Sequence, residues 1–275
     1  MHDARARWLA AHPYLDPVAR LQELVEGAAR SASATPADEV RWEAYWPEYA
    51  AGIPLLRSRA AAVDGVPHGA AALELVLDRV ASAPLSGPIP ARARELREAL
   101  SRSGAAAAEA VASLGRGGGG PALPHPGLVR FLGWSALAGV LRPVVEAFGA
   151  RRDEASWGRG ACPTCGALPV LAQLAGPEAA RQRRLACGPC GTRWAFPRLG
   201  CPHCGNAASD RLAALEIEGE GRLRLDVCEA CQGYLKTYEG EGDEALFLAD
   251  WPTLHLDVLA RDRGLVRRGA SLYDP

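Results

Sequence analysis

Four Cys-x-x-Cys turns constrain this chain more than any other feature of its sequence. They occupy residues 162–165, 187–190, 201–204 and 228–231, and no cysteine lies outside them. Each turn places two sulfurs on one side of a tight loop, where both can bind one metal ion at about 2.3 Å. Two turns supply the four thiolates of a tetrahedral site. Four turns therefore predict two closed metal sites.

Spacing indicates which turns share an ion. Twenty-one residues separate the first turn from the second and 23 separate the third from the fourth, but only 10 separate the second from the third. Ribbon-type sites leave about 15–20 residues between their turns, enough for a β-hairpin. We therefore pair the first turn with the second and the third with the fourth. The predicted ligands are Cys162, Cys165, Cys187 and Cys190 in one site, and Cys201, Cys204, Cys228 and Cys231 in the other.

The cysteine region repeats one pattern twice. Cys-Pro-Thr-Cys-Gly at residues 162–166 matches Cys-Pro-His-Cys-Gly at residues 201–205, and similar apolar and strand-like runs follow each. The pattern predicts two tandem rubredoxin-like or zinc-ribbon-like β modules, residues 156–199 and 200–245, whose folding depends on bound metal because they are small. The glycine that follows the first turn of each module, Gly166 or Gly205, permits a positive φ. Gln232 stands at that place in the fourth turn, which we expect to be looser.

The first 155 residues are predicted to be helical. Asp16-Pro17 and Thr35-Pro36 have the form of helix starts, and a glycine-rich run at 115–121 predicts a loop. Apolar spacing predicts further helices in residues 73–80, 91–100, 105–114 and 131–148, the last kinked or restarted at Pro143. We therefore expect an α+β protein: an N-terminal all-helical domain at 1–155, two β modules, and a C-terminal helix and tail at 246–275.

Two groups of residues in the helical half could have a functional role. Aromatic side chains recur at helical spacing at Trp42, Tyr45, Trp46 and Tyr49. This pattern favours packing in a bundle core over a partner-binding face. Three histidines of this half, at positions 12, 68 and 125, each stand beside proline or glycine. Their context favours a position in a loop over a chemical role.

The charges argue against a protein built mainly to bind nucleic acid or an anionic membrane. The chain has 31 Lys and Arg against 32 Asp and Glu, a net charge of −1. An arginine-rich stretch at residues 181–198, with Trp194 and Phe196, leaves a nucleic-acid-binding zinc ribbon as an alternative. The segment 216–244 is acidic, and metal-bound thiolates add negative charge. A peptide or protein partner therefore suits this region better.

The sequence predicts a soluble, cytoplasmic protein. Residues 1–15 have no apolar core of a signal peptide. The longest apolar stretch, 128–148, is interrupted by Arg130, Arg142, Pro143 and Glu146, which a membrane-spanning helix rarely carries. Thiols stay reduced in a cytosol, which favours metal binding over disulfides.

The cysteine pattern predicts no catalytic residue. All-cysteine tetrads are closed and leave no position for a substrate. A thioredoxin-type redox pair needs one reactive turn at a helix N-terminus, and iron–sulfur clusters usually have other spacings. Four thiolates suit iron and zinc equally, so the residues alone do not choose the metal. They also leave a structural role and an electron-transfer or iron-sensing role open.

These motifs resemble those of the formate dehydrogenase accessory proteins of the FdhE family. The resemblance rests on Cys162-Pro-Thr-Cys-Gly, on the stretch from Cys187 to Asn206, on Cys228-Glu-Ala-Cys-Gln-Gly-Tyr-Leu-Lys236 and on the closing segment 248–260. It covers residues 160–263. The helical half agrees with the architecture of that family but carries no specific motif.

The resemblance implies a cytoplasmic, non-enzymatic maturation factor. Such a protein acts on the catalytic subunit of a formate dehydrogenase, a molybdenum or tungsten enzyme often exported with its cofactor in place. The resemblance also implies rubredoxin-like sites associated with iron, with the eight cysteines as ligands; zinc stays possible. We expect the chain to bind the immature catalytic subunit and support its activation. The alternatives are a zinc-ribbon nucleic-acid-binding protein and a rubredoxin-like electron carrier.

Overall fold

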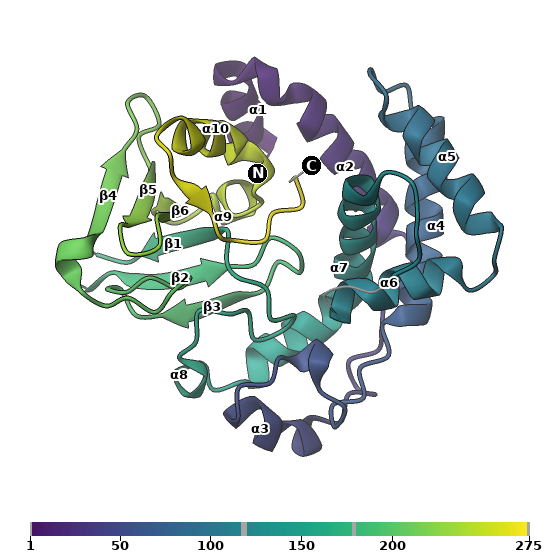
Figure 1. Ribbon diagram of the computed structural model, residues 1–275, viewed down its shortest axis with the longest axis horizontal. Helices are drawn as coiled ribbons and strands as arrows, with labels where there is room; N and C mark the ends of the chain where they lie inside the picture. The colour runs from purple at the N-terminus through teal and green to yellow at the C-terminus, as the bar shows by residue number, and fades with distance from the viewer. Residues whose placement is uncertain (1, 117–119, 178–179, 274–275) are drawn as a thin grey trace. The chain divides into compact units, whose positions relative to one another are not determined.

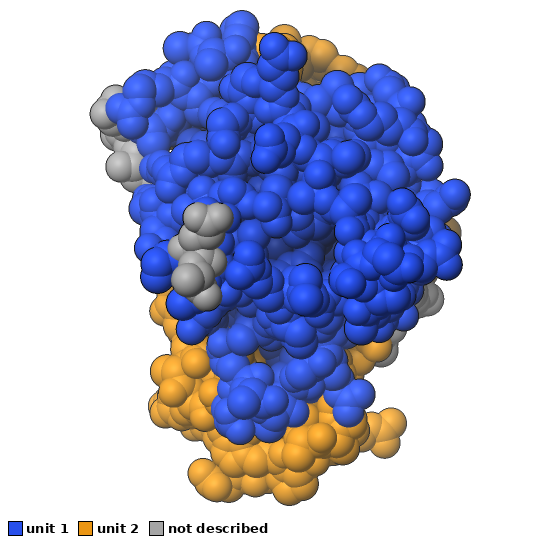
Figure 2. Space-filling model, turned by 90° about the vertical axis from the view of Figure 1, so that its left-hand side faces the viewer, with its two compact units in different colours: residues 1–13, 153–271 blue, residues 14–152, 272–275 orange. Residues whose placement is uncertain are grey.

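The computed structural model describes residues 2–116, 120–177 and 180–273 (Figure 1). The chain divides into two compact units, coloured separately in Figure 2. The helical unit comprises residues 14–152 and 272–275, and the sheet unit comprises residues 1–13 and 153–271. Part of the predicted glycine-rich loop, residues 117–119, lies outside the described residues.

Prolines mark the starts of most helices in the helical unit. Pro17, Pro67, Pro90 and Pro126 occupy the first turns of α2, α4, α5 and α7, where no intrahelical partner is needed for the missing N–H. The elements are η1 (Pro13–Leu15, across the unit boundary), α2 (Asp16–Arg30), α3 (Trp42–Ala50), η2 (Leu55–Arg57), α4 (Val66–Ser82), α5 (Ile89–Ser101), α6 (Ala106–Arg116) and α7 (Pro126–Arg151). The start predicted at Asp16 is confirmed.

The helix predicted to start at Thr35-Pro36 starts instead at Trp42, so that prediction is wrong. Residues 33–36 have no regular structure. The backbone N–H of Thr35 donates to the carbonyl oxygen of Val140 in α7 at 2.8 Å. Thr35 Oγ1 is buried and has no hydrogen-bond partner among the described residues, so this side chain caps no helix.

The central element of the helical unit is α7. It packs against α2, α4 and α6 and buries Leu132, Val140, Val144 and Phe148. Pro143 lies inside α7 and neither ends nor restarts it. Among the described residues α7 alone is long and apolar enough to span a membrane, and half of its most apolar window is buried in the protein. That burial is typical of the core helix of a folded domain.

The aromatic residues of α3 pack around one side chain of α7. Trp42, Tyr45, Trp46 and Tyr49 all have ring centroids 5.7–6.3 Å from that of Phe148. Tyr45 and Tyr49 are buried. These contacts support the prediction that this group belongs to a helix-bundle core.

Seven strands in the described part of the sheet unit form one sheet. They are β1 (Leu171–Ala175), β2 (Gln182–Ala186), β3 (Arg193–Phe196), β4 (Leu212–Glu216), β5 (Leu223–Cys228), β6 (Gly233–Glu239) and β7 (Val266–Arg267). The order is β3-β2-β1-β6-β5-β4, with β7 beside β6. Strands β1–β3 form one antiparallel meander and β4–β6 a second. Each meander holds the strands predicted for one module, and the α+β fold class is confirmed.

The two meanders join through a parallel pair. Leu171 of β1 lies opposite Lys236 of β6, and the register continues to Leu174 opposite Glu239. The buried Gln173 side chain donates from Nε2 to the carbonyl oxygen of Gly240 at 2.7 Å. Both modules therefore share one continuous sheet.

The remaining helices of the sheet unit lie around its strands. They are α1 (His2–Ala11), α8 (Glu154–Trp157), η4 (Ser209–Arg211), α9 (Glu244–Phe247), η5 (Trp251–Thr253) and α10 (Leu254–Asp262). Trp8 of α1 donates from Nε1 to the carbonyl oxygen of Pro252 at 3.1 Å and meets the ring of Phe247 edge-on at 4.9 Å. These contacts attach the N-terminal helix to the C-terminal elements of the same unit (Figure 1).

Candidate metal centre

The first and second Cys-x-x-Cys turns come together in one buried cluster. The Sγ atoms of Cys162 and Cys190 lie 3.5 Å apart, and those of Cys165 and Cys187 lie 3.4 Å apart. All four side chains are buried. All four sulfurs lie within 4.8 Å of one another.

The third and fourth turns form the second cluster. The Sγ atoms of Cys201 and Cys231 lie 3.8 Å apart, as do those of Cys204 and Cys228. Cys201 and Cys228 are buried, whereas Cys204 is exposed and Cys231 is intermediate. The pairing predicted from spacing is confirmed, but only the second cluster reaches the surface.

Sulfur spacing in both clusters fits one four-coordinate ion. A regular tetrahedron with metal–sulfur bonds of about 2.3 Å has edges of about 3.8 Å. The observed separations of 3.4–3.8 Å are at or just below that edge. Zn²⁺ and iron both suit such a thiolate set, and the fourfold cysteine coordination leaves no open position.

The turns share one backbone design. In the first three, the amide of the glycine after the second cysteine donates to the carbonyl oxygen of the first cysteine at 2.9–3.0 Å. These glycines, Gly166, Gly191 and Gly205, have φ values of 80°, 69° and 77°. Gln232 takes the same place in the fourth turn with φ 55°. The fourth turn therefore keeps the left-handed conformation, at a cost that glycine avoids.

Hydroxyl groups approach the sulfurs of the first cluster. Cys190 Sγ lies 3.2 Å from Thr192 Oγ1, which donates to Thr164 Oγ1 at 2.7 Å. Both threonines are fully buried. Polar groups that lie next to a metal ligand can orient that ligand and tune a bound metal.

Burial opposes ionisation of the thiols. It raises the pKa of Cys187 well above its ordinary value and raises the pKa of Cys201 to about 12. Several thiolates cannot share a buried space unless a cation compensates their charge. The donor sets are therefore suited to a metal ion and unsuited to four free thiolates.

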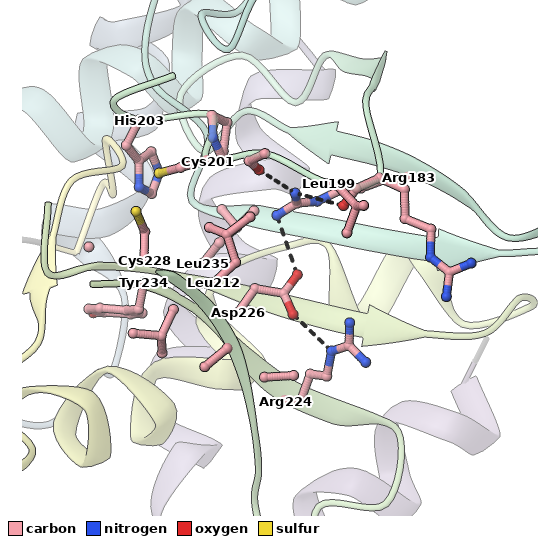
Figure 3. Close-up of a pocket in the computed structure, with 17 residues that line it drawn as sticks. Arg183, Leu199, Cys201, His203, Leu212, Arg224, Asp226, Cys228, Tyr234 and Leu235 are labelled. Carbon is pink, nitrogen blue, oxygen red and sulfur yellow. Dashed lines mark hydrogen bonds and ion pairs between the residues drawn. The ribbon is translucent and has the colours of Figure 1, made fainter. Parts of the chain in front are cut away.

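A cavity of about 170 Å³ lies beside the second cluster (Figure 3). Its lining includes Cys201, Cys228 and the apolar side chains of Leu199, Leu212 and Leu235. Figure 3 also shows Asp226 between two arginines, with Arg183 Nη2 at 3.3 Å and Arg224 Nε at 2.8 Å. The cavity thus combines apolar side chains with a polar wall of ion-paired side chains.

The arginine-rich stretch is largely paired within the sheet unit. Arg184 Nη2 lies 2.7 Å from Glu154 Oε1, and Arg181 Nη1 lies 3.4 Å from Glu239 Oε2. Arg183 is buried against Asp226. Charges held in such pairs do not form the open basic face that phosphates require. These contacts weaken the nucleic-acid-binding alternative.

His203, inside the third turn, links the two modules. Its Nε2 lies 3.1 Å from the carbonyl oxygen of Pro169, which follows the first turn in the chain. Gly160 and Pro202 also lie close together, because a Cβ added to Gly160 would lie 1.9 Å from the Pro202 carbonyl oxygen. The two cysteine regions are therefore packed backbone to backbone.

One further group of potential ligands escaped the sequence-based prediction. His12, Glu220 and His255 bring their ligand atoms within 4.8 Å of one another in the sheet unit. These residues are far apart in sequence and follow no spacing rule. Only the tertiary structure identifies them.

Comparison with known proteins gives a consistent result. No protein-family model matches the chain. A Pseudomonas aeruginosa protein named "Protein FdhE homolog" is 36% identical over 123 residues, which are 42% of this chain and 39% of that protein. A protein of the same name from Aquifex aeolicus is 26% identical over 136 residues, 48% of each chain. One from Shewanella baltica is 29% identical over 116 residues, 42% of this chain and 37% of that protein.

In these alignments the chain covers less than half of each relative's length. A solved structure is similar over most of the chain. The crystal structure of the FdhE protein from Pseudomonas aeruginosa superposes with a TM-score of 0.59 at 23% identity, covering 94% of this chain and 86% of that one. At this identity the superposition shows a shared fold.

Proposed function

We propose that the chain is a member of the FdhE family and an accessory protein of a formate dehydrogenase. In this proposal it binds the immature catalytic subunit in the cytoplasm and supports its activation. It is not itself an enzyme. The observation that carries the proposal is the pair of complete four-cysteine clusters in this family context.

The eight cysteines would hold two metal ions, one in each module. Residues 156–199 would form the first module and residues 200–245 the second. Iron, when bound to four thiolates, supplies one-electron chemistry, whereas zinc in the same site is structural. We favour iron on the resemblance to the FdhE family. The turns and the shared sheet would hold each thiolate set in place with or without redox chemistry.

The second module is the better candidate for contact with the client subunit. Its cluster reaches the surface at Cys204, whereas the first cluster is buried. The adjoining cavity offers apolar side chains, including Leu199, which is 66% exposed. A client segment that enters this cavity would touch the wall of a metal site. Client binding and the metal state would then be coupled.

Genetic complementation tests the proposal. Deleting the gene in a formate-oxidising host is expected to abolish formate dehydrogenase activity, and the wild-type gene is expected to restore it. A Cys201→Ser, Cys228→Ser variant should not restore it, while a variant at an exposed position of the helical unit, Arg97→Met, should. Full activity in the deletion strain would refute the accessory role.

Purification of a tagged chain tests partner binding and metal content separately. A tagged chain isolated without oxygen should retain the formate dehydrogenase catalytic subunit, and exposed Leu199→Asp should weaken this retention without loss of metal. Elemental analysis of the same sample should give about two ions per chain. Iron with thiolate charge-transfer absorption would support a redox role. Zinc without visible absorption would confine the clusters to a structural one.

A further inference from the structure

Three segments of the sheet unit converge on one carboxylate. Glu220 Oε1 lies 3.2 Å from His12 Nε2 and 2.9 Å from His255 Nε2. His12 follows α1, Glu220 lies in the turn between β4 and β5, and His255 is in the first turn of α10. The ring centroids of the two histidines are 5.0 Å apart. Two imidazoles and a carboxylate thus face one small volume.

The group is largely shielded from water. The exposed fractions of the His12, Glu220 and His255 side chains are 12%, 10% and 13%. Glu220 Oε2 is buried and has no hydrogen-bond partner among the described residues. A buried carboxylate oxygen without a partner is costly, because it loses its hydration without replacement. A cation in this volume would remove that cost.

The backbone prepares Glu220 for this position. Gly219 and Gly221 flank it with φ values of 85° and 54°. The amide of Glu220 donates to the carbonyl oxygen of Ile217 at 3.1 Å, and its own carbonyl accepts from Leu223 at 3.2 Å. Two left-handed glycines around one acidic residue turn its side chain inward from a solvent-facing hairpin tip.

The contacts of His12 fix the ring as a metal ligand requires. Its Nδ1 lies 3.1 Å from the carbonyl oxygen of Trp8, so this nitrogen carries the proton and donates it. In the neutral imidazole Nε2 then carries the lone pair, and this nitrogen faces Glu220 Oε1. The Trp8 ring stacks on the imidazole with 3.9 Å between centroids and holds its plane. Metal-bound histidines usually donate their second nitrogen to a backbone carbonyl in this way.

The electrostatics favour a cation over a bare cluster. A lone pair on Nε2 and a carboxylate oxygen at 3.2 Å repel each other unless a proton or a metal ion lies between them. A divalent ion would satisfy both imidazoles and the carboxylate at once.

We propose that His12, Glu220 and His255 form a third metal site, which takes a divalent first-row transition ion such as Zn²⁺. Two nitrogens and one oxygen are the donor set of such ions rather than of Ca²⁺ or Mg²⁺. A tetrahedral ion with bonds of about 2.0–2.1 Å needs ligand atoms about 3.3 Å apart, close to the 2.9 and 3.2 Å observed.

Three protein ligands leave a fourth position for water or a partner's side chain. The ion would also fasten α1 and α10 to the β4–β5 turn. This site contains no cysteine and is independent of the proposed role toward formate dehydrogenase.

Metal stoichiometry of the full-length protein tests the site. Zinc-loaded wild type should bind three ions per chain, one more than the two that the four-cysteine clusters bind. Glu220→Gln and His255→Gln should lose that ion and keep the cysteine-bound ions. His125→Gln is the matched control. His125 Nε2 lies 2.7 Å from Glu95 Oε2, but among the described residues this pair is not part of a group of three possible metal ligands. The control should keep the wild-type zinc content.

Cobalt gives a readout that needs no variant. Co²⁺ added to wild type whose cysteine clusters are filled should bind with weak visible absorption and no new thiolate charge-transfer bands. The zinc affinity of the third site should fall more than about tenfold in His255→Gln. Wild type that takes up neither zinc nor cobalt beyond its cysteine clusters overturns the proposal, and Glu220 is then an ionic partner of the histidines alone.

Discussion

Lys236 and Asp257 form an ion pair inside the sheet unit, with 2.8 Å between Nζ and Oδ2 and only 1% and 7% of their side chains exposed. Lys236 is the sole lysine of the chain. It also contacts Asp250, and the Tyr234 hydroxyl donates to Asp257 Oδ1 at 2.7 Å. This network joins β6 to η5 and α10. The Tyr-Leu-Lys motif after the fourth turn therefore has a structural explanation.

Replacing Lys236 should destabilise the sheet unit strongly. Lys236→Met leaves Asp250 and Asp257 buried with less compensating charge, so we expect a loss of about 3–5 kcal/mol in the free energy of unfolding. Arg261→Met, at an exposed position of α10, should change it by less than about 0.5 kcal/mol. Urea unfolding of both metal-loaded variants measures the difference. A loss for Lys236→Met as small as that of the control would contradict the assigned role.

Gly160 is predicted to be essential to the contact between the cysteine regions. In Gly160→Ala the new Cβ would lie 1.9 Å from the Pro202 carbonyl oxygen, so backbone must move. We expect destabilisation by about 1–3 kcal/mol. Gly104→Ala is the control, because its Cβ would meet nothing within 4 Å. Thermal unfolding should separate the two variants, and equal midpoints would show that the close approach is dispensable.

The fourth turn should gain stability from glycine. Gln232 has φ 55°, a conformation that costs a non-glycine residue about 1–2 kcal/mol. Glycine's greater freedom in the unfolded chain offsets part of this gain. We therefore expect Gln232→Gly to stabilise the metal-loaded protein by about 0.5–1 kcal/mol. Gly205→Ala reverses the experiment: φ is 77° there and no atom lies within 4 Å of the added Cβ. If both variants shift stability in the same direction, backbone strain is not the cause.

The two cysteine clusters should release metal at different rates. Cys204 is exposed, whereas all cysteines of the first cluster are buried. A chelator should therefore remove the second ion first, in a phase well separated from the slow loss of the first. Release is followed by the chelator's absorbance together with thiol reactivity. In Cys204→Ser the fast phase should vanish while the slow phase persists, and a single phase in wild type would show that exposure does not govern release.

Much of the site could be predicted because its determinants are local. A Cys-x-x-Cys turn and the left-handed residue after it depend on a few neighbouring residues, and the hairpin lengths limit how turns pair. The strands predicted on either side of the second and fourth turns are present for the same reason. The start predicted at Thr35 was wrong because this residue packs against α7, with its N–H bonded to Val140 and its hydroxyl buried where it caps no helix.

The sequence by itself determined the four turns, their pairing, the two three-stranded meanders and the helical character of the first half, since each follows from local spacing and side-chain periodicity. Only the tertiary structure decided the parallel pairing of β1 with β6, the burial of Lys236 and the meeting of His12, Glu220 and His255. These features join residues separated by tens to hundreds of positions. Their geometry depends on how complete elements pack, a long-range property that no local pattern encodes.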